Sequence, residues 1–406
     1  MAKIAILGFG TVGSGVAEIL QANAALLAAR AGQPLEIGAI LVRSKRTHPL
    51  EHLFVQRMED ILQDESIDLV VECMGGTQAA YPYVKQALAS GRSVVTSNKE
   101  LVAEYGAELL ELAKQKDAAF LFEASVGGGT PILTPMFQSL AAGRIQRIQG
   151  ILNGTTNFML GRMERLEMEF DQALALAQQM GYAEAVDPSD DVDGRDACRK
   201  IAILASLAFG SQIRPGRIQA RGIRVIEASD MKAARQLGCA IKLIAWAKQQ
   251  EDQLNAAVEP MLVPLASQLG QVNDVYNGVM VTGEMAGDVM FYGQGAGKLA
   301  TASAVVADLI LALQQKEAVH NLLFWQPEQS QQPIAGEEGS FACYIRVQGL
   351  AASMMPRLYG EGELVLDEGV QCSYLTENIT AQALEQANRQ VQALGGKVAL
   401  VLRCLE

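Results

Sequence analysis

The sequence predicts an α/β protein with an N-terminal Rossmann domain that contains a doubly wound parallel sheet, an α+β middle domain and a C-terminal ferredoxin-like domain. Short apolar strands alternate with helices up to about residue 143, which is typical of parallel βα units. The pattern changes after Arg144, and a βαββαβ order follows a polar, Pro/Gly-rich stretch at 327–339. We therefore expect domains at 1–143, 144–322 and 340–406, with a linker at 323–339.

Length and composition limit what the chain can be. At 406 residues, of which 50% are hydrophobic, it can build more than one core. No apolar run reaches the length of a membrane span, and the N-terminus enters a strand pattern without a cationic leader. A net charge of -12 without a basic cluster argues against nucleic-acid or membrane binding, so we expect a soluble, cytoplasmic protein.

The residues available for acid–base chemistry are mainly carboxylates and lysines. The 6 cysteines show no CxxC or metal-ligand spacing, which favours reduced thiols over disulfides or zinc. The 3 histidines, His48, His52 and His320, do not lie near a Ser or Cys motif. Proton transfer would therefore fall to Asp, Glu and Lys side chains.

A glycine motif follows the first predicted strand. Residues 3–7 form a short apolar strand, and Gly8-Phe-Gly-Thr-Val-Gly13 opens a helix that we expect to run to about Arg30. In this context the glycines permit a tight turn, and the helix N-terminus can receive a pyrophosphate. A dinucleotide site is favoured over a packing turn, and its residues are Gly8, Gly10, Thr11, Val12 and Gly13.

Basic residues follow the second predicted strand, at about 35–42. An NAD-preferring site would place Asp or Glu at the end of that strand to bind the ribose hydroxyls. Arg43 and Lys45 stand there instead and suit a 2′-phosphate, which indicates NADPH, with NADH as the second choice. The alternative is a solvated basic loop.

Two further predicted strands, 68–73 and 92–95, end in small or polar residues. Ligands of doubly wound sheets bind at the carboxyl ends of the strands. Gly75 and Ser97 lie just beyond such ends, and Lys99 closes the second loop before a helix predicted over 100–115. We expect these residues at the cofactor site, although a strand-end lysine in solvent fits the spacing of Lys99 equally well.

A glycine-rich loop, Ser125-Val-Gly-Gly-Gly-Thr-Pro131, follows a strand predicted over 118–124. Three consecutive glycines let backbone carbonyls turn toward one point, and Glu123 supplies a further oxygen. Such oxygens could hold a hard monovalent or divalent cation. The alternative is a tight crossover between elements.

An acidic stretch precedes a helix in the middle domain. Lys200 lies four residues after Asp196, one turn along the same helix face, and the apolar run 201–209 takes this helix into a core. Taken alone, the acids are typical of a helix start, and Asp196 with Lys200 is typical of a surface pair. The carboxylates are Glu184, Asp187, Asp190, Asp191, Asp193 and Asp196.

The remaining elements complete the two later domains. In the middle domain we expect strands at 145–152, 253–264 and 275–282, helices at 228–249 and 300–315, and a glycine-dense loop at 291–298. In the C-terminal domain we expect strands at 341–348, 363–368, 370–375 and 397–405, and helices at 351–359 and 380–394.

Several motifs stand along the chain in a fixed order: GFGTVG (8–13), VVECMGG (70–76), VVTSNK (94–99), FEASVGGGTPI (122–132), GILNGTTNF (150–158), GYAEAVDPSDDVDGRDACRK (181–200) and FYGQGAG (291–297). In order and spacing they resemble homoserine dehydrogenase over roughly residues 1–320. The resemblance implies reversible reduction of L-aspartate 4-semialdehyde to L-homoserine with NAD(P)H, in threonine, methionine and isoleucine biosynthesis. It also implies a homodimer or homotetramer, and it makes the middle domain the substrate-binding, catalytic and dimerisation domain. No aspartate-kinase region precedes the nucleotide fold, which predicts the monofunctional form.

The resemblance further implies roles for individual residues. Lys200 would protonate the carbonyl oxygen, and Lys99 would lie between nicotinamide and substrate. The amino group of the substrate would be held by Glu184, Asp191 and Asp196, the last of which would also order Lys200.

Cofactor and cation contacts follow from the same resemblance. The phosphates would meet Gly10, Thr11 and Val12, and Gly297 would contact the cofactor. A sodium or potassium ion would be held, mostly through backbone carbonyls, by Glu123, Val126, Gly128 and Thr130.

The chain departs from the family pattern in three places. One is Val263, where a histidine usually precedes the proline, and a packing change is the favoured interpretation there. Val186 is inserted into the usual Glu-Ala-Asp-Pro, which leaves the role of Asp187 open. The C-terminal domain resembles an ACT domain, but residues 349–353 replace the expected Asp-x-Pro-Gly turn by Gly-Leu-Ala-Ala-Ser. Threonine feedback and a purely structural or oligomerising role are therefore both open for this domain.

Two other functions compete. An acylating semialdehyde dehydrogenase needs a nucleophilic cysteine beside a histidine, and Cys73 has no such partner in the sequence. An NADP-binding amino-acid sensor with an inactive dehydrogenase site would keep the fold. The intact Lys99, Glu184, Asp196 and Lys200 argue against the sensor.

Overall fold

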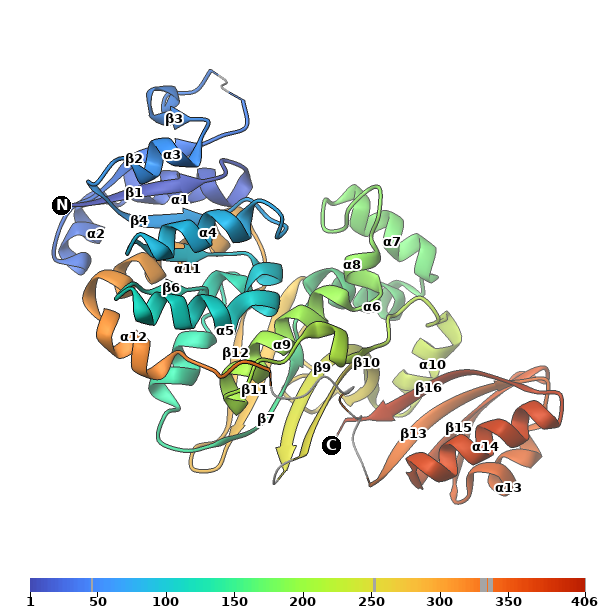
Figure 1. Cartoon of the computed structure of the whole chain (residues 1–406). Helices are drawn as coiled ribbons and strands as arrows, with labels where there is room; N and C mark the ends of the chain where they lie inside the picture. Colours follow the sequence, from blue (N-terminus) through green and yellow to red (C-terminus); the bar gives the residue numbers. More distant parts are fainter. Residues whose placement is uncertain (45–46, 251–252, 329–333, 335–338, 406) are drawn as a thin grey trace. The chain divides into compact units, whose positions relative to one another are not determined.

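The computed structural model describes residues 1–44, 47–250, 253–328, 334 and 339–405 (Figure 1). The chain forms two compact units, each built from segments that are separated in the sequence. Unit 1 comprises Met1–Ile148, Arg199–Arg217 and Val281–Gln332, and unit 2 comprises Gln149–Cys198, Ile218–Met280 and Pro333–Glu406. Residues 329–333 and 335–338 of the expected linker lie outside the described residues.

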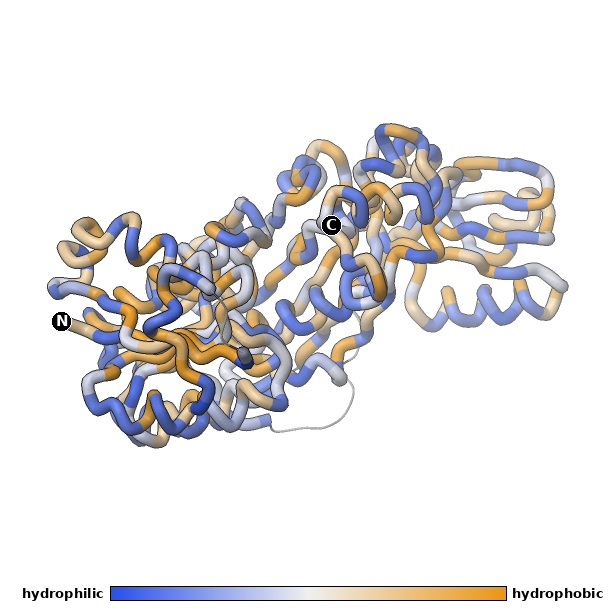
Figure 2. Tube along the Cα trace, turned by 90° about the horizontal axis from the view of Figure 1, so that it is seen from above, coloured by the Kyte–Doolittle hydropathy of each residue, from blue (hydrophilic) through white to orange (hydrophobic). Residues whose placement is uncertain are grey.

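A parallel sheet forms the centre of unit 1. Its order is β3-β2-β1-β4-β5-β6, which is the doubly wound order predicted for a Rossmann domain. Apolar strands buried between helices explain the continuous orange of the chain near the N-terminus in Figure 2. The strands are β1 (Ala2–Leu7), β2 (Leu35–Leu41), β3 (Phe54–Val55), β4 (Ile67–Glu72), β5 (Ser93–Thr96) and β6 (Phe120–Leu121).

The register of this sheet sets where ligands can bind. Leu7 of β1 pairs with Glu72 of β4, and Glu72 pairs with Thr96 of β5. The carboxyl ends of three neighbouring strands therefore meet at one edge. The strand predicted over 118–124 is shorter than expected, because the chain turns into a 3-10 helix, Glu123–Ser125, straight after β6.

The helices of unit 1 include one correction to the sequence prediction. The helix expected from Gly13 to Arg30 is two helices, α1 (Thr11–Ala22) and α2 (Ala24–Ala31), with a bend of 87° at Asn23. Within the described ranges, no single helix is long and apolar enough to cross a membrane, whereas this bent pair passes that test together. The other helices are α3 (Met58–Leu62), α4 (Ala80–Ala89), α5 (Lys99–Gln115), α11 (Lys298–Gln314) and α12 (Lys316–Leu322).

A side chain is inserted into helix α5. Gln212 donates from its amide nitrogen to the carbonyl oxygen of Ala103 (2.7 Å) and accepts the N–H of Ala107 (2.8 Å). Its amide thus replaces the hydrogen bond that would join Ala103 to Ala107 within the helix. Trp325 donates its indole N–H to the same Gln212 oxygen at 2.9 Å, and a Cβ on Gly106 would clash with this indole.

A mixed sheet runs through the second half of the chain in the order β12-β11-β7-β9-β10-β16-β13-β15-β14, with β8 (Gln219–Ala220) beside β10. The predicted helix 228–249 is wrong in its second half, because α10 ends at Gln236 and Gly238 adopts a positive φ of 67°. The apolar run that follows is a strand buried on both faces, whose sequence has no strict alternation. The strands are β7 (Ile145–Ile151), β9 (Cys239–Gln250), β10 (Gln253–Pro264), β11 (Tyr276–Gly283) and β12 (Gly287–Gln294).

Helices cover the part of this sheet that lies in unit 2. Helix α6 packs against β9, and α7 and α10 pack against α6. These helices, together with the two that carry the acidic stretch, are α6 (Gly154–Leu166), α7 (Phe170–Gln179), α8 (Ser189–Val192), α9 (Arg195–Phe209) and α10 (Ala228–Gln236).

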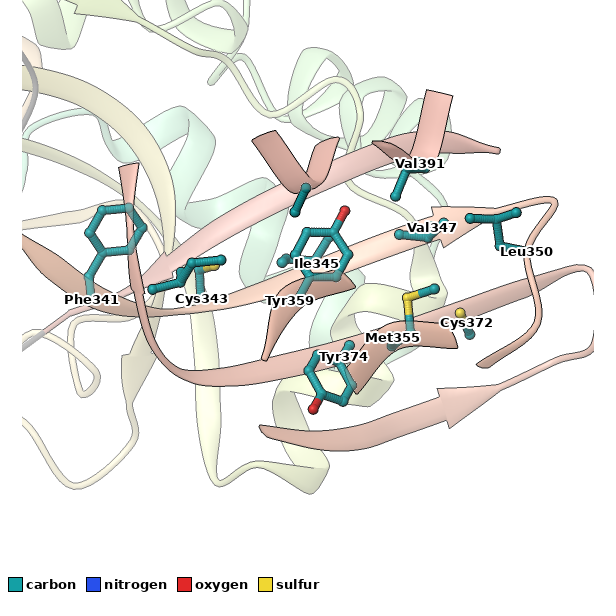
Figure 3. Close-up of a cluster of buried hydrophobic side chains, with 12 residues drawn as sticks. Phe341, Cys343, Ile345, Val347, Leu350, Met355, Tyr359, Cys372, Tyr374 and Val391 are labelled. Carbon is teal, nitrogen blue, oxygen red and sulfur yellow. The ribbon is translucent and has the colours of Figure 1, made fainter. Parts of the chain in front are cut away.

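The C-terminal segment has the predicted βαββαβ order and the strand order β16-β13-β15-β14. Its core lies between this sheet and its helices, with Val347 of β13, Met355 of α13 and Val391 of α14 among the buried side chains (Figure 3). Strand β16 also pairs in parallel with β10, so the segment continues the larger sheet. Its elements are β13 (Ser340–Gln348), α13 (Met355–Tyr359), β14 (Gly362–Asp367), β15 (Gln371–Thr380), α14 (Ala381–Ala393) and β16 (Lys397–Cys404).

Candidate active site

The glycine motif lies between β1 and α1, as its sequence context predicts. Gly8 has a positive φ of 91°, and a Cβ on Gly13 would clash with the carbonyl oxygen of Gly8. Gly10 is the N-cap residue of α1, and among the described residues no heavy atom lies within 4 Å of where its Cβ would be. Thr11 is exposed and Val12 half-buried in the first turn. The turn thus leaves the N-terminal amides of α1 accessible to an anion.

A buried carboxylate organises the edge of the sheet beside this motif. Glu72, which is fully buried, accepts the N–H of Met74 at 2.7 Å and the hydroxyl of Thr96 at 2.5 Å. Burial raises the pKa of the Glu72 carboxyl, although the hydrogen bonds from Thr96 and Met74 oppose the shift. Glu72 therefore ties the loop after β4, which carries Gly75, to the end of β5.

The loop after β5 carries Ser97 and Lys99, and Asn98 between them fixes it. Asn98 accepts the N–H of Leu101 at 3.1 Å as the N-cap of α5, and its amide donates to the carbonyl oxygen of Gly76 at 2.7 Å. Its own N–H donates to the Thr96 hydroxyl at 2.9 Å. Lys99 is thus the first residue of a capped helix and is half-buried, not a lysine in open solvent.

The other predicted cofactor residues lie around this edge or outside the described residues. Arg43 follows β2 and is exposed, whereas Lys45 is outside the described residues. Gly297, with a φ of 132°, is the exposed N-cap residue of α11. Helix α11 packs against α1, and a Cβ on Gly15 of α1 would lie 2.9 Å from the carbonyl oxygen of Lys298.

The glycine-rich loop after β6 is held by the Glu123 side chain. This buried carboxylate accepts the backbone N–H groups of residues 132, 133 and 134 at 2.7, 2.9 and 2.7 Å. The N–H of Glu123 donates to Asp308 at 2.8 Å, and burial raises the pKa of Asp308 well above its usual range. The carboxylate of Glu123 is thus engaged by the backbone of the loop, and its carbonyl oxygen accepts the N–H of Val126 at 3.5 Å.

The carbonyl groups of the same loop are better placed to serve as ligands. Gly128 has a φ of 57°, and a Cβ there would clash with Gly295. Among the described turns and loops, no backbone hydrogen bond ends on the carbonyl oxygen of Val126, Gly128 or Thr130. No group of three His, Cys, Asp or Glu side chains with metal-binding geometry occurs in the described part of the chain.

Unit 2 brings two of the predicted substrate-site acids together. Asn153, at the start of α6, donates from its amide nitrogen to Asp191 at 2.7 Å and to Asp196 at 2.9 Å. Glu184 lies in an exposed turn, where its carbonyl oxygen accepts the Gln178 amide at 2.9 Å. The first turn of α9 and the end of α8 therefore share one polar cluster.

Helix α9 carries Asp196 and Lys200 one turn apart. Their relative exposures are 4% and 9%, so they are not the ordinary surface pair that their spacing, taken alone, would fit. Buried ionisable groups require compensating partners, and both side chains have interactions with neighbouring groups. The pair is therefore part of an interior polar site.

The remaining acids of the stretch have other environments. Val186 is 96% exposed, so the inserted residue is accommodated in a solvent-facing turn. Asp187 in this turn accepts the N–H of Ser189 at 3.0 Å, and hydrogen bonds from Ser189 lower the pKa of Asp187. Asp193 pairs with Arg224 at 2.5 Å, and Asp190 is half-buried.

Sequence reasoning missed three polar residues that hold the site together: Glu72, Asn98 and Asn153. Each had a signal, since an Asn just before a helix is a good N-cap and a Glu at the end of an apolar strand is out of pattern. The sequence could not indicate which groups their remaining hydrogen bonds would reach.

Comparison with known proteins gives one answer along the whole chain. The family model for homoserine dehydrogenase matches residues 131–310, and the model for the homoserine dehydrogenase NAD-binding domain matches residues 8–123. A homoserine dehydrogenase of Synechocystis sp. is 47% identical over 319 residues, 76% of this chain and 72% of that relative.

Solved structures agree. A homoserine dehydrogenase from Thiobacillus denitrificans is 34% identical with a TM-score of 0.90, covering 100% of this chain and 98% of that chain. A hyperthermophilic archaeal homoserine dehydrogenase, in complex with NADPH, is 28% identical with a TM-score of 0.65, covering 77% and 97%. The chain therefore belongs to the homoserine dehydrogenase family, whose members are oxidoreductases.

Proposed function

We propose that the chain reduces L-aspartate 4-semialdehyde to L-homoserine with NADPH, and catalyses the reverse oxidation, within threonine, methionine and isoleucine biosynthesis. The observation that carries this proposal is the pair of acids on Asn153, one of which shares a helix face with the buried Lys200. An amino-acid substrate needs carboxylates for its ammonium group and a proton donor at the reacting carbonyl. This cluster offers both kinds of group.

Proton transfer is assigned to Lys200. Reduction of an aldehyde builds negative charge on the carbonyl oxygen, which a neighbouring ammonium group stabilises and protonates. Asp196, one turn earlier on α9, is assigned to orient this lysine. In the reverse direction the neutral lysine takes the hydroxyl proton of homoserine.

Recognition of the substrate is assigned to acids and to Lys99. Glu184, Asp191 and Asp196 bind the ammonium group, with Glu184 on an exposed turn that can approach a bound ligand. Lys99, at the capped start of α5, interacts with both substrate and cofactor.

The cofactor site fits a dinucleotide. Nicotinamide, when bound, supplies or accepts the hydride. The pyrophosphate is assigned to the amides at the start of α1, where Gly8, Gly10, Thr11, Val12 and Gly13 leave room for it. Arg43 and Lys45 are assigned to the 2′-phosphate, and the archaeal relative with bound NADPH supports this preference. Further contacts are assigned to Gly75, Ser97, Lys99 and Gly297.

A monovalent cation, sodium or potassium, is the second assigned ligand. The carbonyl oxygens of Val126, Gly128 and Thr130 fit this role because they accept no described backbone hydrogen bonds. Glu123 would add its carbonyl oxygen while its carboxylate holds the loop.

Domain roles complete the proposal. The divisions 1–143 for NADP binding, 144–322 for substrate binding, catalysis and dimerisation, 323–339 for a linker and 340–406 for an ACT-like domain are retained. A cytoplasmic homodimer or homotetramer is the expected assembly. The ACT-like domain is assigned a structural role, since Arg346 of β13 is 1% exposed and pairs with the buried Asp230 of α10 at 2.9 Å.

One assay tests the function against its competitors. The protein is mixed with NADPH and L-aspartate 4-semialdehyde without phosphate, and the product is identified. We expect homoserine to form as NADPH is consumed, whereas a nucleotide-binding sensor would consume none. An acylating dehydrogenase is disfavoured also because desolvation and the Glu72 charge raise the pKa of the Cys73 thiol.

A further inference from the structure

The side chain of Asn153 uses every hydrogen-bonding group that it has. Asn153 is 5% exposed. Its two amide hydrogens go to the Asp191 Oδ1 (2.7 Å) and the Asp196 Oδ2 (2.9 Å). Its oxygen accepts both the N–H and the hydroxyl of Thr156, each at 2.9 Å. Charged partners on one side and the helix start on the other thus satisfy the whole amide group.

Chemistry allows only one orientation of this amide. If its nitrogen and oxygen exchanged places, the oxygen would face two carboxylates and the NH₂ group would face the N–H of Thr156. The donors must therefore point at the acids. The side chain caps α6 with its oxygen and bridges the two carboxylates with its nitrogen.

The bridge joins groups whose relative position the backbone does not set by itself. Asp191 belongs to α8 and Asp196 to α9, and Gly194 between them has a φ of 79°. Two carboxylates near one another repel, which raises the pKa of one of them unless a donor compensates. A shared NH₂ group supplies that donor to both and fixes the distance between the acids.

The same helix turn also holds the other end of the acidic stretch. Thr155, next to Asn153 in the chain, donates its hydroxyl to the carbonyl oxygen of Tyr182 at 2.7 Å. The first turn of α6 thus anchors residues on both sides of the exposed turn that contains Val186. The insertion can be absorbed there without moving Asp191 or Asp196.

We propose that Asn153 is a positioning residue for substrate specificity: it holds Asp191 and Asp196 at a set spacing, so that together they recognise an α-ammonium group. This inference rests on the proposed function and deepens it. It predicts that removal of the bridge weakens ligands that carry an ammonium group and leaves ligands without one unaffected.

The test compares variants of Asn153 in the full-length enzyme. Asn153→Ser keeps an oxygen that can cap α6 but has no donors that reach the acids, and Asn153→Asp keeps the shape and the cap without the donors. Thr380→Ala is the matched control, because it removes a different helix cap, the hydrogen bond from Ala383 at 3.2 Å, at the start of α14.

The measurements are the KM of homoserine, the KM of the cofactor, and inhibition constants for L-2-aminobutanoate and for butanoate, which lacks the amino group. For Asn153→Ser and Asn153→Asp we expect the KM of homoserine and the inhibition constant of L-2-aminobutanoate to rise about 10–100-fold. The cofactor KM and the butanoate constant should stay within about twofold of the parent values, and Thr380→Ala should change none of the four.

Three outcomes are decisive in different ways. Unchanged constants for homoserine and L-2-aminobutanoate in a variant that folds would overturn the role of Asn153. An equal rise for butanoate and L-2-aminobutanoate would also overturn it, because only general loss of structure moves both. Failure of the parent protein to oxidise homoserine would refute the proposed function itself, and it is seen before any variant is made. Should Asn153→Ser not fold, Asn153→Asp decides the question, because it retains the cap.

Discussion

Two asparagines begin two helices of this enzyme and do different work with the same side chain. Asn98 caps α5 beside the proposed cofactor site and Asn153 caps α6 beside the proposed substrate site. Each accepts the N–H of the residue three positions on, at 3.1 and 2.9 Å. The amide of Asn98 then donates to a neutral carbonyl, that of Gly76, whereas the amide of Asn153 donates to two carboxylates.

The difference shows how one local motif serves two kinds of site. A cap fixes where a helix begins, and the amide hydrogens that remain decide what is attached to that point. At Asn98 the attached group is the loop after β4, which is proposed to contact the cofactor. On the substrate side it is a set of charges, and hydrogen bonds to charged groups are roughly twice as strong as neutral ones. Substitutions of Asn98 and of Asn153 should therefore differ in how much they weaken binding and in which ligand they affect.

The largest effect should come from Lys200. Replacing it by Met keeps the length and apolar part of the side chain but removes the proposed proton donor, so kcat should fall by about 10²–10⁴. Titration of NADPH fluorescence should give an unchanged Kd, because the cofactor side is untouched. Lys397→Met, at an exposed position on β16, is the control and should leave kcat at the parent value. Near-normal turnover by a folded Lys200→Met variant would remove this lysine as proton donor.

Asn98→Ser should have a smaller effect, and it should weaken binding of the cofactor rather than of homoserine. Serine keeps the cap of α5 and drops the hydrogen bond to Gly76, which is a neutral bond between uncharged groups. Loss of such a bond should weaken cofactor binding about 2–10-fold, without the 10–100-fold loss of homoserine affinity expected at Asn153. Steady-state KM values for both ligands provide the comparison. The contrast between the two caps fails if Asn98→Ser weakens homoserine as much as it weakens the cofactor.

The smallest expected effect is on the free energy of unfolding, and it concerns Lys242, which hydrogen-bonds to α6. Lys242 of β9 is buried and donates to Asn157 at 3.1 Å and to the carbonyl oxygen of Val272 at 2.7 Å. Burial lowers the pKa of Lys242 from 10.5 to about 8. Between these two pH values the unfolded chain binds more protons than the folded one, so the free energy of unfolding should rise with pH.

Lys242→Met should reduce the increase of the free energy of unfolding with pH. Urea unfolding at pH 7.5, 9 and 10.5 measures the free energy of unfolding for the parent and the variant, and Lys397→Met serves as the exposed-lysine control. The parent and the control should gain stability from this group toward high pH, while Lys242→Met should lack that component. Identical pH profiles for all three proteins would show that Lys242 titrates in the folded protein as it does in the unfolded chain.

The sequence was most informative where glycine geometry or strand order restricts the backbone. The clash at Gly13 and the open space at Gly10 follow from the spacing of GxGxxG, and the alternation of strands and helices predicted the parallel sheet. The βαββαβ segment was also predicted, because its strands and helices are separated by turns. Each of these features depends on residues that are close together in the chain.

Errors arose where local pattern was ambiguous. Residues 239–250 are apolar on both faces of a buried strand, so neither a period of 2 nor one of 3.6 marks them, and the helix before them was extended too far. Asn23 ended α1 and began α2 without a Pro or Gly to signal the 87° bend. The spacing of Asp196 and Lys200 alone fitted a surface pair, whereas the family motif predicted both at the site, and both are buried. Asn153 could be predicted as a cap but not as a bridge, because its two acids lie 38 and 43 positions away.

The contacts of Gln212 with α5 limit the exchange of the N-terminal, cofactor-binding half between related proteins. The N–H of Ala107 donates to Gln212, 105 positions later in the chain. The Trp325 indole occupies the space that a Cβ on Gly106 would need. A ribosome must therefore make most of the protein before the helix that starts at Lys99 can reach its final form. The N-terminal half therefore cannot be exchanged between relatives independently of the residues that pack on α5. A chimera that joins it to the remainder of a distant relative must bring a matching glutamine and tryptophan, or leave the space beside Gly106 empty.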